Sequence, residues 1–571
     1  MYMARSTWTQ VRDYFKKHDL VIIGVGSTEC HGRHNPLGTD TMAPDRILEL
    51  LEQRDGTYLV APTLPYGATD DLVGYPGTVS LGVQGLYDVL SSITRQLFAY
   101  GARRFVFLNG HGGNVKSLSM VSMDLNDAGC LAAVVNWWKV APQLDPAWGG
   151  GHGGAMETSA NLAIDPASVD MSQVTDEDLL HDIGEDMPTT GWNTVSFGGA
   201  EVEFPRRLSR FASSGWVAEG HEDHPSGASA ELGAAMLAGT ATWLQGFTHA
   251  LEGEELPRPI DFSHETDHLD RLRGHVRQPC LEQYVPACRG AGWSQGGKMR
   301  IELSTWPAVE DYFQRGNDLV VMAIGSTEEH GRHNPLGTDT LAPNLLLDKI
   351  EAALGKDVLI APTIPFGNAD DLLGFPGTLS IGYDLLRSLV RTLSMQLYDY
   401  GARRFLFING HGPNIKPISS VCEELNRRGC LAARADWWLM AGELNPAWRG
   451  GHGGAEETAA VMAVDPSLVD ASELGPMALA NDISDELPTS GWDNVEFKGA
   501  HVAIPRDACR YAGNGWIGPD DPALADPEWG GQMMDGVAAY LVDFIGALGR
   551  APLPAPMPVR TTKAYAGADN N

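Results

Sequence analysis

The chain contains the stretch Gly26-Ser27-Thr28-Glu29-Cys30-His31-Gly32-Arg33-His34-Asn35-Pro36-Leu37-Gly38-Thr39-Asp40, and it contains a second copy, Gly325-Ser326-Thr327-Glu328-Glu329-His330-Gly331-Arg332-His333-Asn334-Pro335-Leu336-Gly337-Thr338-Asp339. Each copy directly follows an apolar run, Leu20–Val25 or Leu319–Ile324, of the kind that forms a buried strand. Each copy holds a glutamate, a histidine two positions later and an aspartate at its end. Carboxylates and imidazole gathered just past a buried strand indicate a metal site.

The rest of the chain repeats around these two copies. The offset between the copies is 299 positions at Asp40 and Asp339, becomes 300 by Ala61 and Ala361, and the correspondence fades after Arg210. A repeat of this length is a domain duplication and excludes a short-repeat solenoid. We predict one domain over residues 1–250 and another over 301–550, with an interdomain connection over 251–300 and an extended tail over 551–571.

Strand and helix patterns alternate within each copy, which predicts an α/β fold. In the first copy, strands are expected over 20–25, 58–62, 105–108 and 131–135, with helices over 44–54, 86–100, 115–126 and 155–163. Pro44 is expected in the first turn of its helix. Such alternation implies a mostly parallel sheet with helices on both faces. Ligands of these sheets bind beyond the C-terminal ends of the strands, where Glu29, His31 and His111 stand.

Composition excludes several classes of partner. The formal net charge is 41 − 73 = −32, so neither a nucleic acid nor an anionic membrane surface is expected to bind. No apolar run approaches the roughly 20 residues that a membrane span needs. The seven cysteines contain no CxxC pair, which argues against a thiolate metal site or a disulfide framework. We expect a soluble, cytoplasmic protein.

Five side chains of each copy form the first candidate site. They are Glu29, His31, Asp40, His111 and Glu157 in the first copy, and Glu328, His330, Asp339, His411 and Glu457 in the second. Imidazole and carboxylate without sulfur suit Zn²⁺, Mn²⁺ or Fe²⁺, and two ions sharing a bridging carboxylate would use all five ligands. The alternative is that Thr39 and Asp40 only cap a helix and that the Asn-Gly-His-Gly stretch is only a tight turn.

A glycine-rich loop before a helix carries a further histidine in each copy, His152 or His452. Either side chain is a candidate general acid or base. The glycine N–H groups beside it are candidates for holding an oxyanion. The alternative is a histidine that caps or packs at the start of the helix.

Two further patterns have weaker support. The first is a set of tryptophans near these histidines, in which core packing is expected for one of each adjacent pair and a pocket wall for the other: Trp137, Trp138 and Trp148, repeated as Trp437, Trp438 and Trp448. The second is an HExxH match, His264 to His268, which has no counterpart in the second copy and lies in the polar connection, so we reject it as a metal site.

The motifs Gly-Ser-Thr-Glu-x-His-Gly…Gly-Thr-Asp, Asn-Gly-His-Gly-x-Asn and His-Gly-Gly-x-x-Glu-Thr, in this order in both copies, resemble those of the creatininase (creatinine amidohydrolase) family. The resemblance implies two tandem three-layer α/β/α domains, oligomers that are often hexamers, and two divalent ions per domain, usually Zn²⁺ or Mn²⁺. It further implies that Glu29, Asp40 and His111 hold one ion and that His31, Asp40 and a further glutamate hold the other. Asp40 would bridge the two ions, and His152 matches the family's catalytic histidine.

The chain departs from creatininase itself at one point. Creatininase has Tyr and then a ligand Glu after the histidine of Asn-Gly-His, whereas this chain has Gly112-Gly113 or Gly412-Pro413. In the branch of the family with Gly-Gly at this point, the missing carboxylate is supplied by the position of Glu157 or Glu457. That branch includes a formamidopyrimidine deformylase, peptidases that mature redox peptides and hydrolases of oxidised inositols.

These observations lead to one main functional prediction. We expect a hydrolase that cleaves an amide, with a cyclic C–N bond favoured, of a small molecule through a metal-bridging hydroxide. His152 or His452 would protonate the leaving nitrogen. The alternatives are hydrolysis of a cyclic ketone or lactone-like substrate derived from inositol, a peptidase or deformylase activity, and a metal-bound structural protein with degenerate sites. If each half corresponds to one family subunit, three chains would form a pseudo-hexamer.

Overall fold

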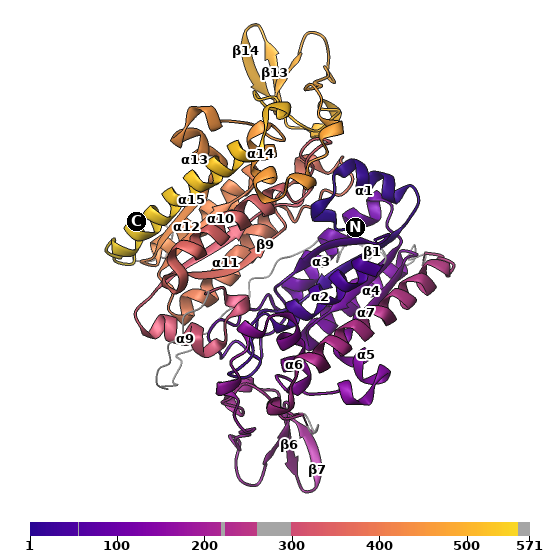
Figure 1. Cartoon of the computed structure of the whole chain (residues 1–571), viewed down its shortest axis with the longest axis vertical. Helices are drawn as coiled ribbons and strands as arrows, with labels where there is room; N and C mark the ends of the chain where they lie inside the picture. Colours follow the sequence, from indigo (N-terminus) through magenta and orange to yellow (C-terminus); the bar gives the residue numbers. More distant parts are fainter. Residues whose placement is uncertain (55, 219–222, 260–298, 558–571) are drawn as a thin grey trace, which may run out of the picture.

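The computed structural model describes residues 1–54, 56–218, 223–259 and 299–557. Within these ranges the two copies, called the first and second half below, repeat the same order of helices and strands. Figure 1 shows the halves lying side by side, with a small β-sheet arm projecting from each at opposite ends of the molecule. The arms are β5 (Thr189–Gly191), β6 (Thr194–Phe197) and β7 (Ala200–Glu203), repeated as β12 (Thr489–Gly491), β13 (Asn494–Phe497) and β14 (Ala500–Ala503).

A four-stranded parallel sheet forms the centre of each half. In the first half the order is β2-β1-β3-β4, with β1 at Leu20–Val25, β2 at Leu59–Leu64, β3 at Arg104–Asn109 and β4 at Leu131–Asn136. The second half repeats the order with β8 (Leu319–Ile324), β9 (Leu359–Ile364), β10 (Arg404–Asn409) and β11 (Leu431–Asp436). Val25 pairs with Asn109, so the loops that leave β1 and β3 begin side by side.

Helices cover both faces of each sheet because the strand side chains alternate between two cores. Leu20 and Ile22 belong to one core, and Val21 and Ile23 belong to the other. The first face carries α2 (Thr39–Arg54), α5 (Trp137–Leu144), α6 (Ala155–Ile164) and α7 (Ala230–Gly253), and the other carries α3 (Gly82–Tyr100) and α4 (Val115–Asp127). The equivalents are α10 (Thr338–Leu354), α13 (Trp437–Leu444), α14 (Ala455–Val464), α15 (Pro527–Arg550), α11 (Gly382–Tyr400) and α12 (Ile415–Arg427). The predicted α/β fold with three layers in each half is confirmed.

The helix that carries Asp40 begins earlier than predicted. It starts at Thr39, so Asp40 lies in its first turn and Pro44 lies inside it; the prediction of Pro44 in the first turn was wrong. Because Pro44 has no N–H, the carbonyl of Asp40 lacks its usual helical donor. Gly110 packs against that carbonyl so closely that a Cβ would lie 1.8 Å from the oxygen. The glycine of Asn-Gly-His therefore lets the end of β3 approach the first turn of α2.

The leading segment of each half contacts the candidate ligand loop of the other half. The N–H groups of Leu37 and Gly38 donate to the carbonyls of Ser304 (2.9 Å) and Glu302 (3.0 Å) in the other half. Reciprocally, Leu336 and Gly337 donate to Ser6 (2.9 Å) and Ala4 (3.1 Å). These segments lead into α1 (Trp8–Phe15) and α9 (Trp306–Gln314). Each ligand loop is thus held by the half to which it does not belong.

Side chains repeat this reciprocity across the contact between the halves. Gln96 bonds both backbone groups of Ser380, at 2.6 and 2.7 Å, and Gln396 does the same at Ser80, at 2.8 and 2.7 Å. One continuous hydrophobic core contains residues of both halves, including Leu86 and Leu386. The two halves therefore pack as a pseudo-symmetric pair with a shared core and not as two separate domains.

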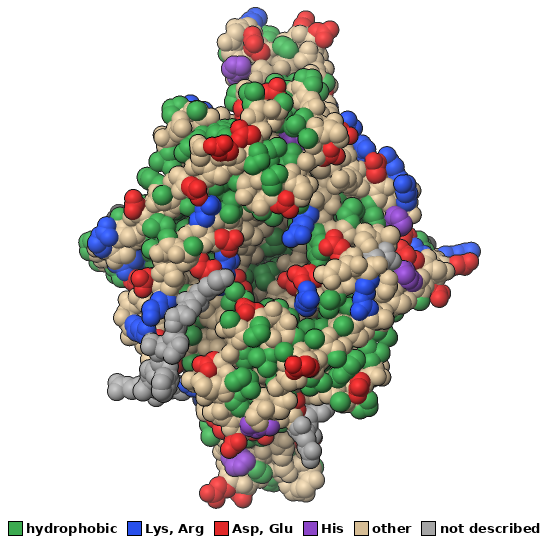
Figure 2. Space-filling model, viewed as in Figure 1, with side chains coloured by type: hydrophobic (Ala, Val, Ile, Leu, Met, Phe, Trp, Pro, Cys, Tyr) green, Lys and Arg blue, Asp and Glu red, His purple; other side chains and the backbone are tan. Residues whose placement is uncertain are grey.

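The remaining predictions concern the surface and the connection. No helix of the described residues is long and apolar enough to cross a membrane. Acidic and basic side chains are scattered over the face in Figure 2 and do not gather into one patch. The HExxH match at His264 and His268, most of the predicted connection, and the tail from residue 558 lie outside the described residues.

Candidate metal centres

Three side chains of the first half converge from the sheet edge. Glu29 follows β1, Asp40 lies in the first turn of α2, and His111 follows β3. His111 Nδ1 is 2.9 Å from Glu29 Oε1 and 3.2 Å from Asp40 Oδ2. All three side chains are buried, and their ligand atoms lie within reach of one metal ion.

A second group shares Asp40 with the first. His31 Nε2 is 3.0 Å from the other aspartate oxygen, Oδ1, and 3.7 Å from Glu157 Oε2 in the first turn of α6. These three side chains are also buried and within reach of one ion. Asp40 thus presents one oxygen to each group, which is the arrangement of a bridging carboxylate.

The orientation of the histidine rings fits a cation between them and the carboxylates. His111 Nε2 lies 3.2 Å from the carbonyl of Ala68, and His31 Nδ1 lies 3.1 Å from the carbonyl of Glu29. A carbonyl only accepts, so each of these ring nitrogens carries a hydrogen, and the neutral ring turns its lone pair toward the carboxylates. Lone pairs facing carboxylate oxygens repel unless a proton or a metal ion lies between them. Within the described residues, Glu29 Oε1 and Asp40 Oδ2 have no hydrogen-bond partner, so the residues present fit divalent ions.

The second half builds the same two groups. His411 Nδ1 is 2.8 Å from Glu328 Oε1 and 3.2 Å from Asp339 Oδ2. His330 Nε2 is 2.9 Å from Asp339 Oδ1 and 3.6 Å from Glu457 Oε2. The structure therefore brings together all ten side chains that the sequence singled out as ligands, five in each half.

Burial and charge act in opposite directions on these groups. Burial lowers the pKa of His31, but the charges of Asp40 and Glu157 raise it to about 10. The pKa of His330 is raised to about 10 in the same way, by the charges of Asp339 and Glu457. Burial raises the pKa of Glu157 to about 8, against the charge of His31. Without metal, each cluster would take up protons near neutral pH, so protons and metal ions compete for it.

The candidate catalytic histidines stand next to these groups. The ring centroid of His152 is 4.4 Å from that of His31, and the same distance separates His452 from His330. His452 Nδ1 lies 4.0 Å from Glu328 Oε1, so this nitrogen faces the cluster. Burial, followed by the charge of His31, lowers the pKa of His152 to about 3 and keeps its imidazole neutral. His152 also lies within reach of an ion shared with Glu29 and His31.

The glycine-rich loop does not offer the free N–H groups that the sequence suggested. Gly151 donates to Asp223 Oδ2 at 2.9 Å, Gly153 donates to Glu157 Oε2 at 2.7 Å, and Gly154 donates to the carbonyl of Gly151. The second half repeats these bonds, with Asp520 in place of Asp223. The expectation that these glycines hold an oxyanion was wrong, because their donors orient the loop and the ligand glutamate instead.

The predicted tryptophans lie mainly in the core. Trp137 and Trp437 are buried among residues of α2 and α7, or of α10 and α15. Trp138, Trp148, Trp438 and Trp448 pack against the same two clusters. A pocket role for these four stays a prediction. The aromatic side chains beside the candidate catalytic histidines are instead Trp192 and Trp492, which the sequence analysis missed although Gly191-Trp192 recurs as Gly491-Trp492.

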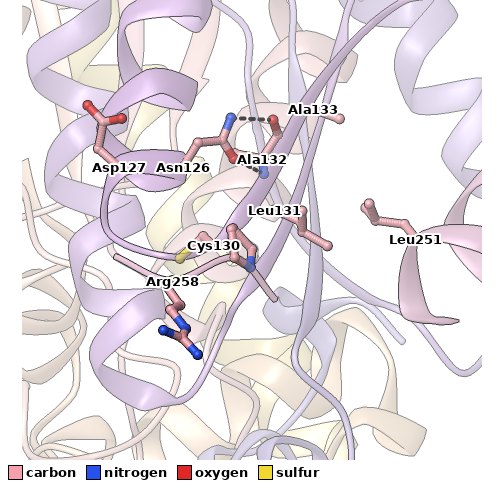
Figure 3. Close-up of a pocket in the computed structure, with 9 residues that line it drawn as sticks. Asn126, Asp127, Cys130, Leu131, Ala132, Ala133, Leu251 and Arg258 are labelled. Atoms are coloured by element: carbon pink, nitrogen blue, oxygen red, sulfur yellow. Dashed lines mark hydrogen bonds between the residues drawn. The ribbon is translucent and has the colours of Figure 1, made fainter. Parts of the chain in front are cut away.

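A surface hollow of about 410 Å³ lies elsewhere, at the start of β4. Leu131, Leu251 and Arg258 are among the residues that line it (Figure 3), and none of the proposed ligands is a lining residue. The start of a parallel strand is the edge opposite to the ligand loops, so we do not assign this hollow to the candidate site.

A family model matches both halves of the chain, and several known proteins are similar to parts of it. The family model described as "Creatininase: Creatinine amidohydrolase" matches residues 4–247 and 302–545. The creatinine amidohydrolase of Pseudomonas putida is 31% identical over 199 residues, which is 31% of this chain and 76% of that protein. A mycofactocin precursor peptide peptidase of Mycolicibacterium smegmatis is 36% identical over 166 residues, 27% of this chain and 62% of the peptidase. A 3-dehydro-scyllo-inosose hydrolase of Thermotoga maritima is 36% identical over 113 residues, 20% of this chain and 36% of that enzyme.

A solved structure titled "Creatininase Mn" is 26% identical, covers 44% of this chain and 99% of its own, and has a TM-score of 0.35. Another is titled as a Zn-Zn type of creatininase. The two matched segments of the family model cover most of the sequence. The chain therefore belongs to the creatininase family of hydrolases, and it carries two copies of the family's domain in tandem.

Proposed function

We propose that each half is a binuclear-metal-dependent hydrolase site that cleaves an amide, preferably a cyclic C–N bond, of a small molecule. The observation that supports this is the pair of ligand groups sharing Asp40, repeated around Asp339. Each half would hold two divalent ions, Zn²⁺ or Mn²⁺, with Fe²⁺ as a further candidate from the same ligand chemistry. Such ions supply an activated water at neutral pH and polarise a carbonyl oxygen.

The side chains of the chain take the other roles in this proposal. Glu29 and His111 hold one position, His31 and Glu157 hold the other, and Asp40 joins them. His152, or His452 in the second half, stands beside the ligand groups, accepts a proton from the attacking water and passes it to the leaving nitrogen, with Nδ1 as the nitrogen that faces the cluster. Burial of the five ligand side chains limits their contact with bulk water and strengthens their electrostatic interactions.

The test combines metal analysis with a substrate panel. The purified protein is stripped with a chelator, reloaded with Zn²⁺ or Mn²⁺, and incubated with creatinine, other cyclic amides, formamides, short peptides and cyclic ketones. We expect two bound ions in each half and turnover of a cyclic amide that requires the metal. The double variant Asp40→Ala/Asp339→Ala should lose the ions and the turnover, whereas the surface control Glu49→Gln should keep both. Full activity in the double variant would overturn the proposal.

The same panel separates the alternatives that the relatives raise. The similar proteins are named for creatinine, for a precursor peptide and for an inosose. Turnover of a peptide alone, or of a cyclic ketone alone, would assign the site to that substrate class. It would not contradict the proposed metal chemistry. Bound metal with no turnover of any compound would favour the structural alternative.

Assembly is a separate part of the proposal. The two halves already pack as a pair within one chain, so three chains would present six family domains. Sedimentation is expected to give a trimer, and a monomer would remove this part.

A further inference from the structure

A tryptophan from the arm of each half reaches the candidate catalytic histidine. Trp192 lies in the turn between β5 and β6, and its ring centroid is 5.2 Å from that of His152 with the planes inclined at 72°. Trp492 takes the same position, 5.0 Å from His452 at 70°. Both rings are half-buried, so part of each faces solvent or a bound molecule.

The backbone next to this tryptophan is held in an uncommon conformation. Asn193 has φ 53° and Asp493 has φ 52°, in the left-handed region that asparagine and aspartate tolerate best after glycine. The Asn193 side chain accepts from the N–H of Arg206 at 2.9 Å, and its carbonyl accepts from Phe204 at 2.6 Å. Asp493 makes the same two bonds. Such positions persist where surrounding bonds over-determine them, and they are frequent at functional sites.

The tryptophan in turn holds a carboxylate. Trp492 Nε1 donates to Asp371 Oδ2 at 3.1 Å, and Asp371 lies in the short 3₁₀ helix η10 (Asp370–Leu372), which follows β9. In the first half, burial raises the pKa of Asp71 and a hydrogen bond from Trp192 opposes the rise. The charges of Glu29 and His111 act on Asp71, and those of His411 and His452 act on Asp371, so both carboxylates lie near the proposed metal positions. Within the described ranges, neither aspartate forms an ion pair with a lysine or arginine, which leaves acceptor capacity for a ligand.

The chemistry of amide hydrolysis determines which part of the substrate lies next to the tryptophan and the aspartate of each half. Water adds to the carbonyl carbon, the C–N bond breaks, the carbonyl side leaves as a carboxylate, and the nitrogen takes up a proton. The metal positions attract the carboxylate side. The nitrogen side must face His152, and Trp192, which donates a hydrogen bond to Asp71, is beside that histidine.

We propose that Asp71 with Trp192, and Asp371 with Trp492, form the subsite for the nitrogen-bearing part of the substrate, and that the aspartate accepts a hydrogen bond from a substrate N–H. This inference rests on the proposed amide hydrolysis and selects, within it, substrates that carry an N–H donor next to the scissile bond. The indole N–H orients the carboxylate, and the indole ring forms an apolar wall.

The experiment uses the full chain with the first site silenced by Asp40→Ala, so that only the second site turns over. The probes are glutarimide and N-methylglutarimide, which share the scissile carbonyl and differ in the N–H. We expect kcat/KM to favour glutarimide by about 10- to 100-fold, the range for a hydrogen bond to a charged acceptor. Asp371→Asn should abolish this preference, mainly by lowering kcat/KM for glutarimide, while the metal content stays unchanged. Trp492→Phe, which keeps a ring but loses the donor, should reduce the preference in part.

The outcomes separate the inference from the proposed function. A preference that is absent in the parent protein, or unchanged in Asp371→Asn, would overturn the inference. Equal loss for both imides would make Asp371 a structural residue and would also overturn it. Hydrolysis of neither imide would overturn the inference, and the proposed function would fall only if the metal-loaded protein also left every amide of the wider panel intact.

Discussion

In the first half the residue between Glu29 and His31 is Cys30, whereas the equivalent position of the second half is Glu329. Glu329 Oε1 lies 3.2 Å from His452 Nε2, and its other oxygen accepts from the N–H of Gly331 at 3.0 Å. Cys30 bonds only weakly to a backbone carbonyl, at 3.3 Å, and within the described residues His152 Nε2 has no hydrogen-bond partner. Nε2 of the candidate catalytic histidine therefore has a carboxylate partner in the second half, whereas in the first half it has none among the described residues.

Two further positions add carboxyl groups to the second half. Glu456 replaces Met156 beside the ligand glutamate, and burial raises its pKa to about 9, so that it is neutral at pH 7. Asp436 replaces Asn136 and accepts from Asn409 at 2.8 Å. The ligands themselves are the same residue types in both halves. The proposed metal chemistry would thus be common to both halves, whereas the residues around the candidate catalytic histidine differ.

The largest expected effect tests whether the two centres are separate. Asp40→Ala should remove the ions of the first half and its turnover, and Asp339→Ala should do the same in the second half, because each aspartate joins both ligand groups of its own half only. Metal analysis should therefore show about half of the bound metal in each single variant. Loss of all metal in either variant would show that the halves bind metal as one unit.

The next effect concerns the support behind the histidine. Glu329→Gln, measured with the first site silenced, should lower kcat about tenfold, since the partners that orient a reacting or ligating imidazole typically contribute that much. Cys30→Ala, measured with the second site silenced, should change kcat little. Similar losses in the two variants would mean that Glu329 has no special role. Metal content is the control in both cases.

A smaller and symmetric effect is expected where the halves exchange segments. An added Cβ at Gly38 would lie 2.5 Å from the carbonyl of Glu302, and one at Gly337 would lie 2.5 Å from that of Ala4. Gly38→Ala and Gly337→Ala should each lower the free energy of unfolding by about 1–3 kcal/mol through overpacking. The control is Gly246→Ala, because no atom other than its chain neighbours and the backbone of its own helix lies within 4 Å of a Cβ there. Thermal unfolding with and without metal measures the effect. A loss of stability in only one of the two variants would show that the two contacts do not contribute equally.

The smallest difference between the halves is expected in pH dependence. The pKa of His31 and that of His330 are both raised to about 10 by adjacent carboxylates in the metal-free protein, so at pH 7 both rings are protonated and must lose a proton to bind metal. Metal affinity should rise with pH between 6 and 8 by about tenfold per unit for each proton released. Calorimetry in buffers of different ionisation enthalpy should find the same proton release when either half is silenced. A pH-independent affinity would contradict this reading of the histidines.

Local pattern was sufficient for much of the fold. The apolar run Leu20–Val25 is a buried strand as predicted, and the helix expected over 86–100 extends to Gly82–Tyr100. The start of α2 differs from the prediction because proline usually marks a first turn, whereas Pro44 lies inside this helix, where Gly110 packs closely against it. That approach joins the end of β3 to the first turn of α2, two segments far apart in the sequence, and no local rule anticipates it.

The sequence alone identified the duplication, the parallel α/β halves and the ten side chains that the structure brings together, because short spacings and strand ends constrain where those residues can lie. The folded chain was needed for the rest. Burial of Trp137, the bonds that occupy Gly151 and Gly153, and the hold of Glu302 and Ser304 on the opposite ligand loop all depend on contacts between distant segments. Trp192 lies beside His152 for the same reason, because the turn between β5 and β6 and the loop of His152 are distant in the sequence and meet only in the folded chain.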